Sequence, residues 1–139
     1  MNPWPMIGGV ANVMCMESEF IRPNHGKAGD VLVLTKPLGT QPAVNMKQRL
    51  SKEDGEAFFA ERGIESERIE HAYFMAMESM ATLNRNAAML MRKYSSHGAT
   101  DVTGFGILGH AENLAAAQIS KVDIVIRSLP IISEMDSQV

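Results

Sequence analysis

The chain has 139 residues, of which 45% are hydrophobic, and 13 basic against 16 acidic residues give a net charge of −3. This length suits one domain or part of one, and the apolar content argues against disorder. The acidic balance, without a dense run of Lys or Arg, argues against a nucleic-acid-binding protein. No uncharged apolar stretch reaches the roughly 20 residues of a membrane span. The single cysteine, Cys15, excludes an internal disulfide and a multi-thiolate zinc site. We therefore expect a soluble α-plus-β domain in a reducing compartment such as the cytoplasm.

Two strands are predicted in the first 35 residues. Residues 6–16 (MIGGVANVMCM) are mostly apolar, small or β-branched, which favours a strand, although Gly8 and Gly9 weaken it. After a polar turn, residues 31–35 (VLVLT) form a continuous apolar run. Such a run is typical of a strand that is buried on both faces.

The middle of the chain is predicted to be helical. Composition favours helices over residues 42–50 and, more briefly, over 57–59. A long helix is expected from Glu67 to Tyr94, with Ser66 as its N-cap and an apolar stripe through Ile69, Tyr73, Met77, Met80, Asn84, Ala87 and Met91. A further helix is expected over residues 105–118, with Thr103 as its cap.

The last third of the chain adds one strand and one short helix. Residues 121–128 (KVDIVIRS) alternate apolar and polar side chains, as a half-buried strand does. Pro130 suits the first turn of a terminal helix. The resulting order, β-β-α-α-α-β-α, predicts an α/β or mixed α+β fold.

Residues 104–109 (GFGILG) match the pattern G-x-G-x-x-G, and Asp123 follows. On spacing alone this is a dinucleotide-binding fingerprint. The surroundings of the motif do not fit this interpretation. A buried strand should precede the motif, but residues 95–103 are polar. The acidic residue should lie at the end of the next strand, but Asp123 lies at its start. The alternative is that the small residues let the start of this helix approach neighbouring backbone closely.

Three polar side chains near this motif are candidates for metal or phosphate binding. Asp101 precedes a helix start and could hold Mg²⁺, although an aspartate there is more commonly a capping or turn residue. His97 and His110 flank it, but a zinc site would need a fourth ligand. Lys36 ends a predicted strand, where a lysine can meet phosphate or simply remain solvated.

Three stretches resemble the selenophosphate synthetase (selenide, water dikinase) family. Residues 29–41 (GDVLVLTKPLGTQ) look like the entry to the second domain of that family. Residues 99–110 (ATDVTGFGILGH) resemble its D-x-T-G-F-G-x-x-G-H block almost residue for residue. Asn2-Pro3-Trp4 followed by residues 7–11 (IGGVA) resembles the end of its first domain. The resemblance spans the chain apart from the divergent residues 51–67.

This resemblance implies a fold like that of aminoimidazole ribonucleotide synthetase. An N-terminal ATP-binding domain pairs with its copy in a homodimer, and a C-terminal α/β domain follows. The family makes selenophosphate, AMP and phosphate from selenide, ATP and water with Mg²⁺, for selenocysteine synthesis. By resemblance, Asp101 matches a metal-binding aspartate of the second domain.

The resemblance also has gaps. The family's glycine-rich segment with a reactive Cys or selenocysteine and a nearby lysine has no match, and Cys15 is not that residue. We therefore expect an internal fragment: residues 1–28 as the end of the first domain and 29–139 as the first part of the second. Such a fragment is expected to be inactive alone. The alternatives are a self-associating structural half-domain and, from the glycine motif, a dinucleotide binder.

Overall fold

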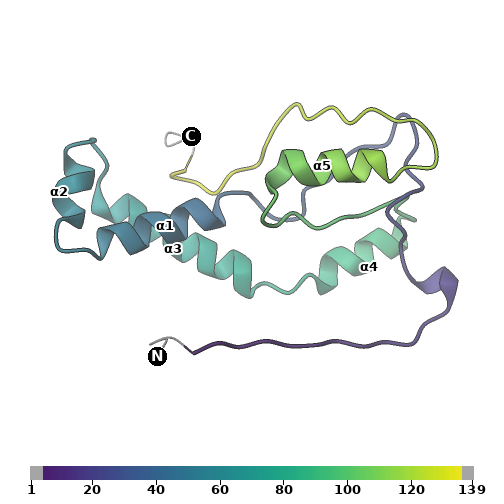
Figure 1. Ribbon diagram of the computed structural model, residues 1–139, viewed down its shortest axis with the longest axis horizontal. Helices are drawn as coiled ribbons and strands as arrows, with labels where there is room; N and C mark the ends of the chain where they lie inside the picture. The colour runs from purple at the N-terminus through teal and green to yellow at the C-terminus, as the bar shows by residue number, and fades with distance from the viewer. Residues whose placement is uncertain (1–4, 136–139) are drawn as a thin grey trace.

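The computed structural model describes residues 5–135, which are almost entirely helical or extended. In chain order the elements are the 3₁₀ helix η1 (Glu17–Glu19) and the α-helices α1 (Thr40–Leu50), α2 (Gly55–Ala60), α3 (Ser66–Ala81), α4 (Arg85–Lys93) and α5 (Gly106–Ala116). Helices α1, α2 and α3 gather at one end of the molecule, and α5 lies toward the other (Figure 1). The helices predicted around 42–50, 57–59 and 105–118 are therefore confirmed, with slightly different ends.

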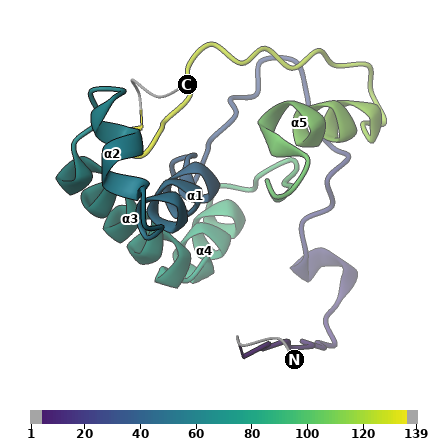
Figure 2. The same cartoon turned by 60° about the vertical axis from the view of Figure 1, so that its left-hand side comes forward.

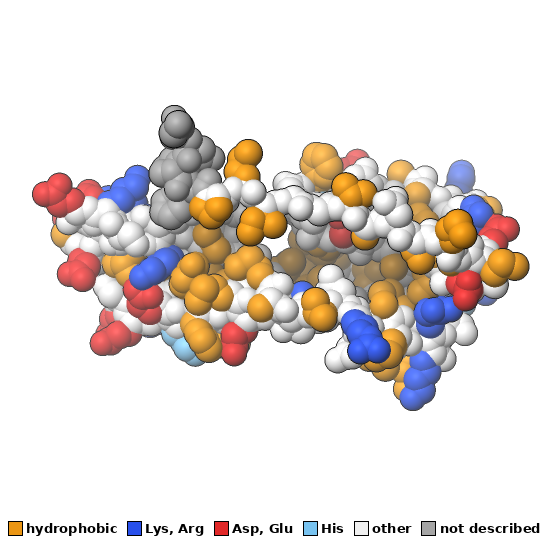
Figure 3. Space-filling model, turned by 90° about the horizontal axis from the view of Figure 1, so that it is seen from below, with side chains coloured by type: hydrophobic (Ala, Val, Ile, Leu, Met, Phe, Trp, Pro, Cys, Tyr) orange, Lys and Arg blue, Asp and Glu red, His pale blue; other side chains and the backbone are white. Residues whose placement is uncertain are grey.

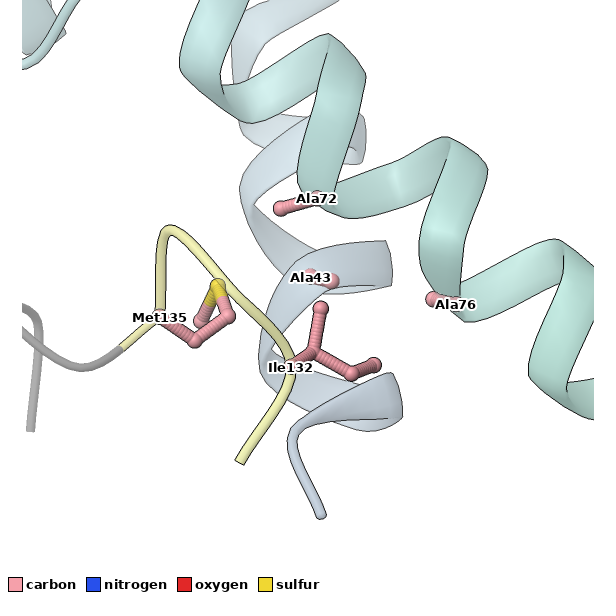
Figure 4. Packing of buried hydrophobic residues seen from close by; sticks show 5 residues of the cluster. All are labelled: Ala43, Ala72, Ala76, Ile132 and Met135. Atoms are coloured by element: carbon pink, nitrogen blue, oxygen red, sulfur yellow. The ribbon is translucent and has the colours of Figure 1, made fainter. Parts of the chain in front are cut away.

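The core lies between α1 and α3. Ala43 of α1 and Ala72 and Ala76 of α3 are buried, and their small side chains let the two helices approach closely. Ile132 and Met135, from the end of the described chain, cover this contact and are also buried (Figure 4). The core therefore joins segments that are far apart in the sequence.

A parallel bridge holds the last segment in place. The backbone N–H of Leu38 donates to the carbonyl of Pro130 at 2.9 Å, and the N–H of Ile132 donates to the carbonyl of Leu38 at 2.9 Å. The predicted terminal helix after Pro130 is not formed over residues 130–135, where a turn brings the N–H of Met135 to the carbonyl of Ile132. The remainder of that prediction, residues 136–139, lies outside the described range.

The predicted long helix is two helices. α3 ends at Ala81, and Thr82 is extended at φ −68° and ψ 120° before α4 begins at Arg85. Asn84, which the apolar stripe placed inside one helix, is the N-cap of α4. At this interruption the carbonyls of Ser79 and Thr82 accept hydrogen bonds from the side chain of Lys36.

The buried face of α3 also differs from the predicted stripe. Ile69 of the stripe is buried, as predicted. The other buried residues of α3 are Ala72 and Ala76, which lie off the stripe. Met77 and Met80 of the stripe are 41% and 57% exposed. Small side chains face α1 because they allow the close approach of the two helices, and the larger methionines lie outside that contact.

The three predicted strands are extended segments without a ladder. Over the described residues no strand is formed, so the α/β class is not confirmed. The segment predicted to be buried on both faces is instead exposed, with Val31 at 84% and Val33 at 78%. Extended backbone becomes a sheet only when a neighbouring strand lies alongside and exchanges hydrogen bonds. Residues 121–128 keep the predicted alternation, since Val122, Ile124 and Ile126 are half-buried and their neighbours exposed.

The N-terminal segment runs apart from the helices in two views (Figures 1 and 2). No helix in the described part of the chain is long and apolar enough to cross a membrane.

Candidate functional site

The candidate site is the loop that leads into α5 and the first two turns of that helix. Asp101 lies in this loop, and its side chain is 73% exposed. Phe105 is the N-cap of α5, so the predicted cap, Thr103, lies two residues too early. The carbonyl of Thr103 instead accepts the N–H of Gly106 at 3.0 Å, which closes a turn.

His110 joins this loop to the helix. It is 7% exposed, and among residues 5–135 it is the one buried residue with a polar or charged side chain. Its Nε2 accepts the backbone N–H of Thr103 at 2.9 Å and lies 3.2 Å from the Thr103 hydroxyl. Its Nδ1 lies 3.4 Å from Oδ1 of Asp101. The sequence placed His110 near Asp101 only as a zinc candidate, and it missed this arrangement.

The glycines of the G-x-G-x-x-G pattern shape the turn. Gly106 has φ +67°, a left-handed conformation that favours glycine. A Cβ on Gly109 would lie 2.9 Å from the Cβ of Phe105, so glycine there lets the Phe105 side chain fold back over the helix. The Phe105 ring lies 5.7 Å from the His110 ring. Residues 95–103 form no strand, so the strand that a dinucleotide fold needs ahead of the motif is missing from the described chain.

His97 lies with a different carboxylate. Its Nδ1 is 2.9 Å from both carboxylate oxygens of Asp30, and Asp30 also accepts the backbone N–H of Lys27 at 2.8 Å. The Lys27 N–H and then His97 hold the pKa of Asp30 below its usual range. The two histidines therefore belong to separate pairs. Among residues 5–135 no cluster of three or more His, Cys, Asp or Glu side chains could hold a metal, so the zinc alternative has no support.

Lys36 lies at the end of α3. Its ammonium donates to the carbonyl oxygens of Ser79 at 2.9 Å and Thr82 at 2.6 Å. These carbonyls end the helix, where backbone acceptors lack partners within the helix and a cation is favourable. Lys36 thus caps the end of α3, at the place where the predicted long helix is interrupted, and its role with phosphate stays a prediction.

Asp101 is suited to supply one ligand of a Mg²⁺ site in which other groups supply the remaining ligands. Proteins bind Mg²⁺ through one or two carboxylates, with waters and substrate phosphates completing the octahedron. Asp101 is an exposed carboxylate, so its oxygens are accessible to a cation and a phosphate chain from outside. Among the described residues, Asp101 belongs to no group of three or more His, Cys, Asp or Glu side chains that could hold the cation by themselves.

The comparisons with known proteins show the family to which the chain belongs. Residues 27–139 match the family described as AIR synthase related protein, C-terminal domain, which is part of the AIR synthase-like fold. "Selenide, water dikinase 3" of Danio rerio is 55% identical over 135 residues, which is 97% of this chain and 30% of that protein. "Selenide, water dikinase 2" of Homo sapiens is 54% identical over 136 residues, also 97% of this chain and 30% of that protein.

A third relative has a similar name and a similar identity to the chain. "Selenide, water dikinase" of Trypanosoma brucei brucei is 53% identical over 133 residues, which is 94% of this chain and 33% of that protein. The chain thus spans about a third of the length of the curated relatives that it matches. The family match covers most of the chain and includes the loop of Asp101 and all of α5. The chain therefore belongs to the AIR synthase related proteins, through their C-terminal domain.

Proposed function

We propose that this chain is part of a selenide, water dikinase, which makes selenophosphate, AMP and phosphate from selenide, ATP and water. The observation that carries the proposal is identity of 53–55% to three proteins of that name, over nearly the whole chain. The placing of residues 1–28 in a first domain and 29–139 in a second is part of the same proposal.

In this function Asp101 would help to hold the Mg²⁺ that accompanies ATP. A bound Mg²⁺ neutralises charge that develops on the phosphoryl oxygens as they are transferred. The contribution of Asp101 is an exposed carboxylate at the start of α5, held where its loop meets the helix. Phosphate, water and further carboxylates would supply the remaining ligands, as is usual for Mg²⁺ in proteins.

The test is the substitution Asp101→Asn in the full-length protein that contains this chain. The amide keeps the size of the side chain and removes the charge that attracts Mg²⁺. We expect selenide-dependent AMP formation to fall by orders of magnitude while the circular dichroism spectrum and melting temperature stay unchanged. If turnover and its dependence on Mg²⁺ concentration stay as in the wild type, Asp101 is a turn residue and the proposed metal role is wrong.

We expect the 139-residue chain alone to have no dikinase activity. Phosphoryl transfer requires several groups that position the substrates and neutralise charge together. The chain spans about a third of its relatives, and its described residues contain no group of three or more metal-ligating side chains. Selenide-dependent AMP formation by the purified chain, at a rate typical of enzymes, would contradict this expectation.

A second candidate role, self-association into a homodimer, is supported by the exposed apolar segment 6–16. Ile7, Val10, Val13 and Met14 are 85–99% exposed, and further apolar side chains are exposed on the face that Figure 3 shows. An extended apolar segment with free backbone groups is a template for pairing with another chain. Light scattering at micromolar concentration should report a dimer or larger species. A stable monomer with a cooperative melt would contradict the self-associating role.

A further inference from the structure

His110 is buried near the start of α5, where packing and a hydrogen bond hold its imidazole ring. It is 7% exposed, its ring packs 5.7 Å from the Phe105 ring, and its Nε2 receives the backbone N–H of Thr103 at 2.9 Å. A backbone N–H can only donate, so Nε2 carries the lone pair and no proton. The proton of the neutral imidazole is therefore on Nδ1.

This tautomer turns a donor toward Asp101. Nδ1 of His110 lies 3.4 Å from Oδ1 of Asp101, just beyond the usual 2.7–3.2 Å of an N–H···O hydrogen bond. Contacts of this kind often tighten when the substrate complex forms. Among residues 5–135 the charged contact that the structure gives for the Asp101 carboxylate is this one with His110, and the carboxylate is otherwise 73% exposed.

We propose that His110 is a positioning residue that orients the Asp101 carboxylate for its cation. The Nδ1–H group holds one carboxylate oxygen, which leaves the other oxygen for Mg²⁺. Ligating carboxylates are commonly hydrogen-bonded by outer groups in this way, and removing such a group typically weakens metal binding 10- to 100-fold. The inference rests on the proposed metal role of Asp101 and adds a second residue to it.

The competing role for His110 is structural, since the bond to Thr103 would by itself help to begin α5. Two substitutions separate the two roles, because each retains one half of the imidazole. His110→Asn keeps an amide N–H near the position of Nδ1 and loses the acceptor for Thr103. His110→Gln reaches the position of Nε2 with an amide oxygen and loses the donor to Asp101.

The experiment titrates Mn²⁺, as a paramagnetic stand-in for Mg²⁺, into the full-length protein with a non-hydrolysable ATP analogue. Electron paramagnetic resonance reports the free Mn²⁺. His110→Gln should weaken Mn²⁺ binding roughly 10- to 100-fold, and His110→Asn should weaken it less. The control, His71→Asn, changes a half-exposed histidine of α3 and should bind as the wild type does.

The outcomes separate this inference from the proposed function. If Asp101→Asn weakens Mn²⁺ binding and His110→Gln does not, the role of His110 is structural and the inference is overturned. If Asp101→Asn itself binds Mn²⁺ as the wild type does, the proposed metal role fails first. A further measurement uses the wild-type protein and so does not require that a variant folds. The ¹⁵N chemical shifts of the His110 imidazole should show a proton on Nδ1 and none on Nε2. The opposite tautomer would overturn the inference.

Discussion

Replacing Lys36 by Met tests whether this lysine ends α3 or binds phosphate. Its ammonium donates to two carbonyl oxygens, those of Ser79 and Thr82, at 2.9 Å and 2.6 Å. A hydrogen bond to a charged donor contributes about 1.5–3 kcal/mol when buried. One of these bonds is exposed and the other part-buried, so water screens both. Methionine keeps the apolar stem of the side chain. We therefore expect a net loss of about 1–2 kcal/mol in the free energy of unfolding.

The assay is urea unfolding of the chain, with amide hydrogen exchange in the last turn of α3. The matched control is Lys121→Met, which removes the charge of an exposed lysine for which the structure gives no contact. In Lys36→Met, exchange should accelerate at the N–H of Thr82, which bonds the carbonyl of Glu78. Unchanged unfolding and exchange, together with a loss of ATP affinity in the full-length protein, would refute the capping role and favour the phosphate role.

Three further changes follow from the same structure. Ile132→Ala should lower the free energy of unfolding by about 2–5 kcal/mol in urea, because Ile132 is 1% exposed in the core; a change under about 1 kcal/mol would place it outside the core. Gly98→Ala should lower the melting temperature, since its Cβ would lie 2.8 Å from a backbone carbonyl oxygen; an unchanged melt would contradict that close approach. The lowered pKa of Asp30, caused by the Lys27 N–H and then by His97, stabilises the fold above the unfolded value of about 3.9 and ceases to do so as pH falls through the folded value. The stability gap between the wild type and Asp30→Asn in urea should therefore close with acid, and a gap that is constant between pH 7 and pH 3 would contradict this origin.

The helices were predictable where local signals act alone. Apolar spacing and small residues located α1 and α5, and their observed ends differ from the predicted ends by a few residues. The division between α3 and α4 was not predictable from spacing, because Asn84 falls on the apolar stripe. Asparagine is a favoured N-cap residue, and Asn84 occupies that position before α4, although its side chain makes no capping hydrogen bond.

The strands were the part that sequence patterns could not establish. Alternation in residues 121–128 correctly predicted which side chains would be half-buried. Pairing depends on a second segment at the right distance and direction, and no pattern within one segment carries that information. The contact between Asp101 and His110 was hidden for a similar reason, because eight residues of loop and helix lie between them and only the fold brings them together.

³¹P NMR of the full-length protein supplied with ATP, selenide and Mg²⁺ tests directly whether the protein makes selenophosphate and whether it needs Asp101 to do so. We expect selenophosphate, AMP and orthophosphate to form in equal amounts, and we expect all three products to be lost in Asp101→Asn. Accumulation of ADP without selenophosphate, or the same products at the same rate from Asp101→Asn, would contradict it.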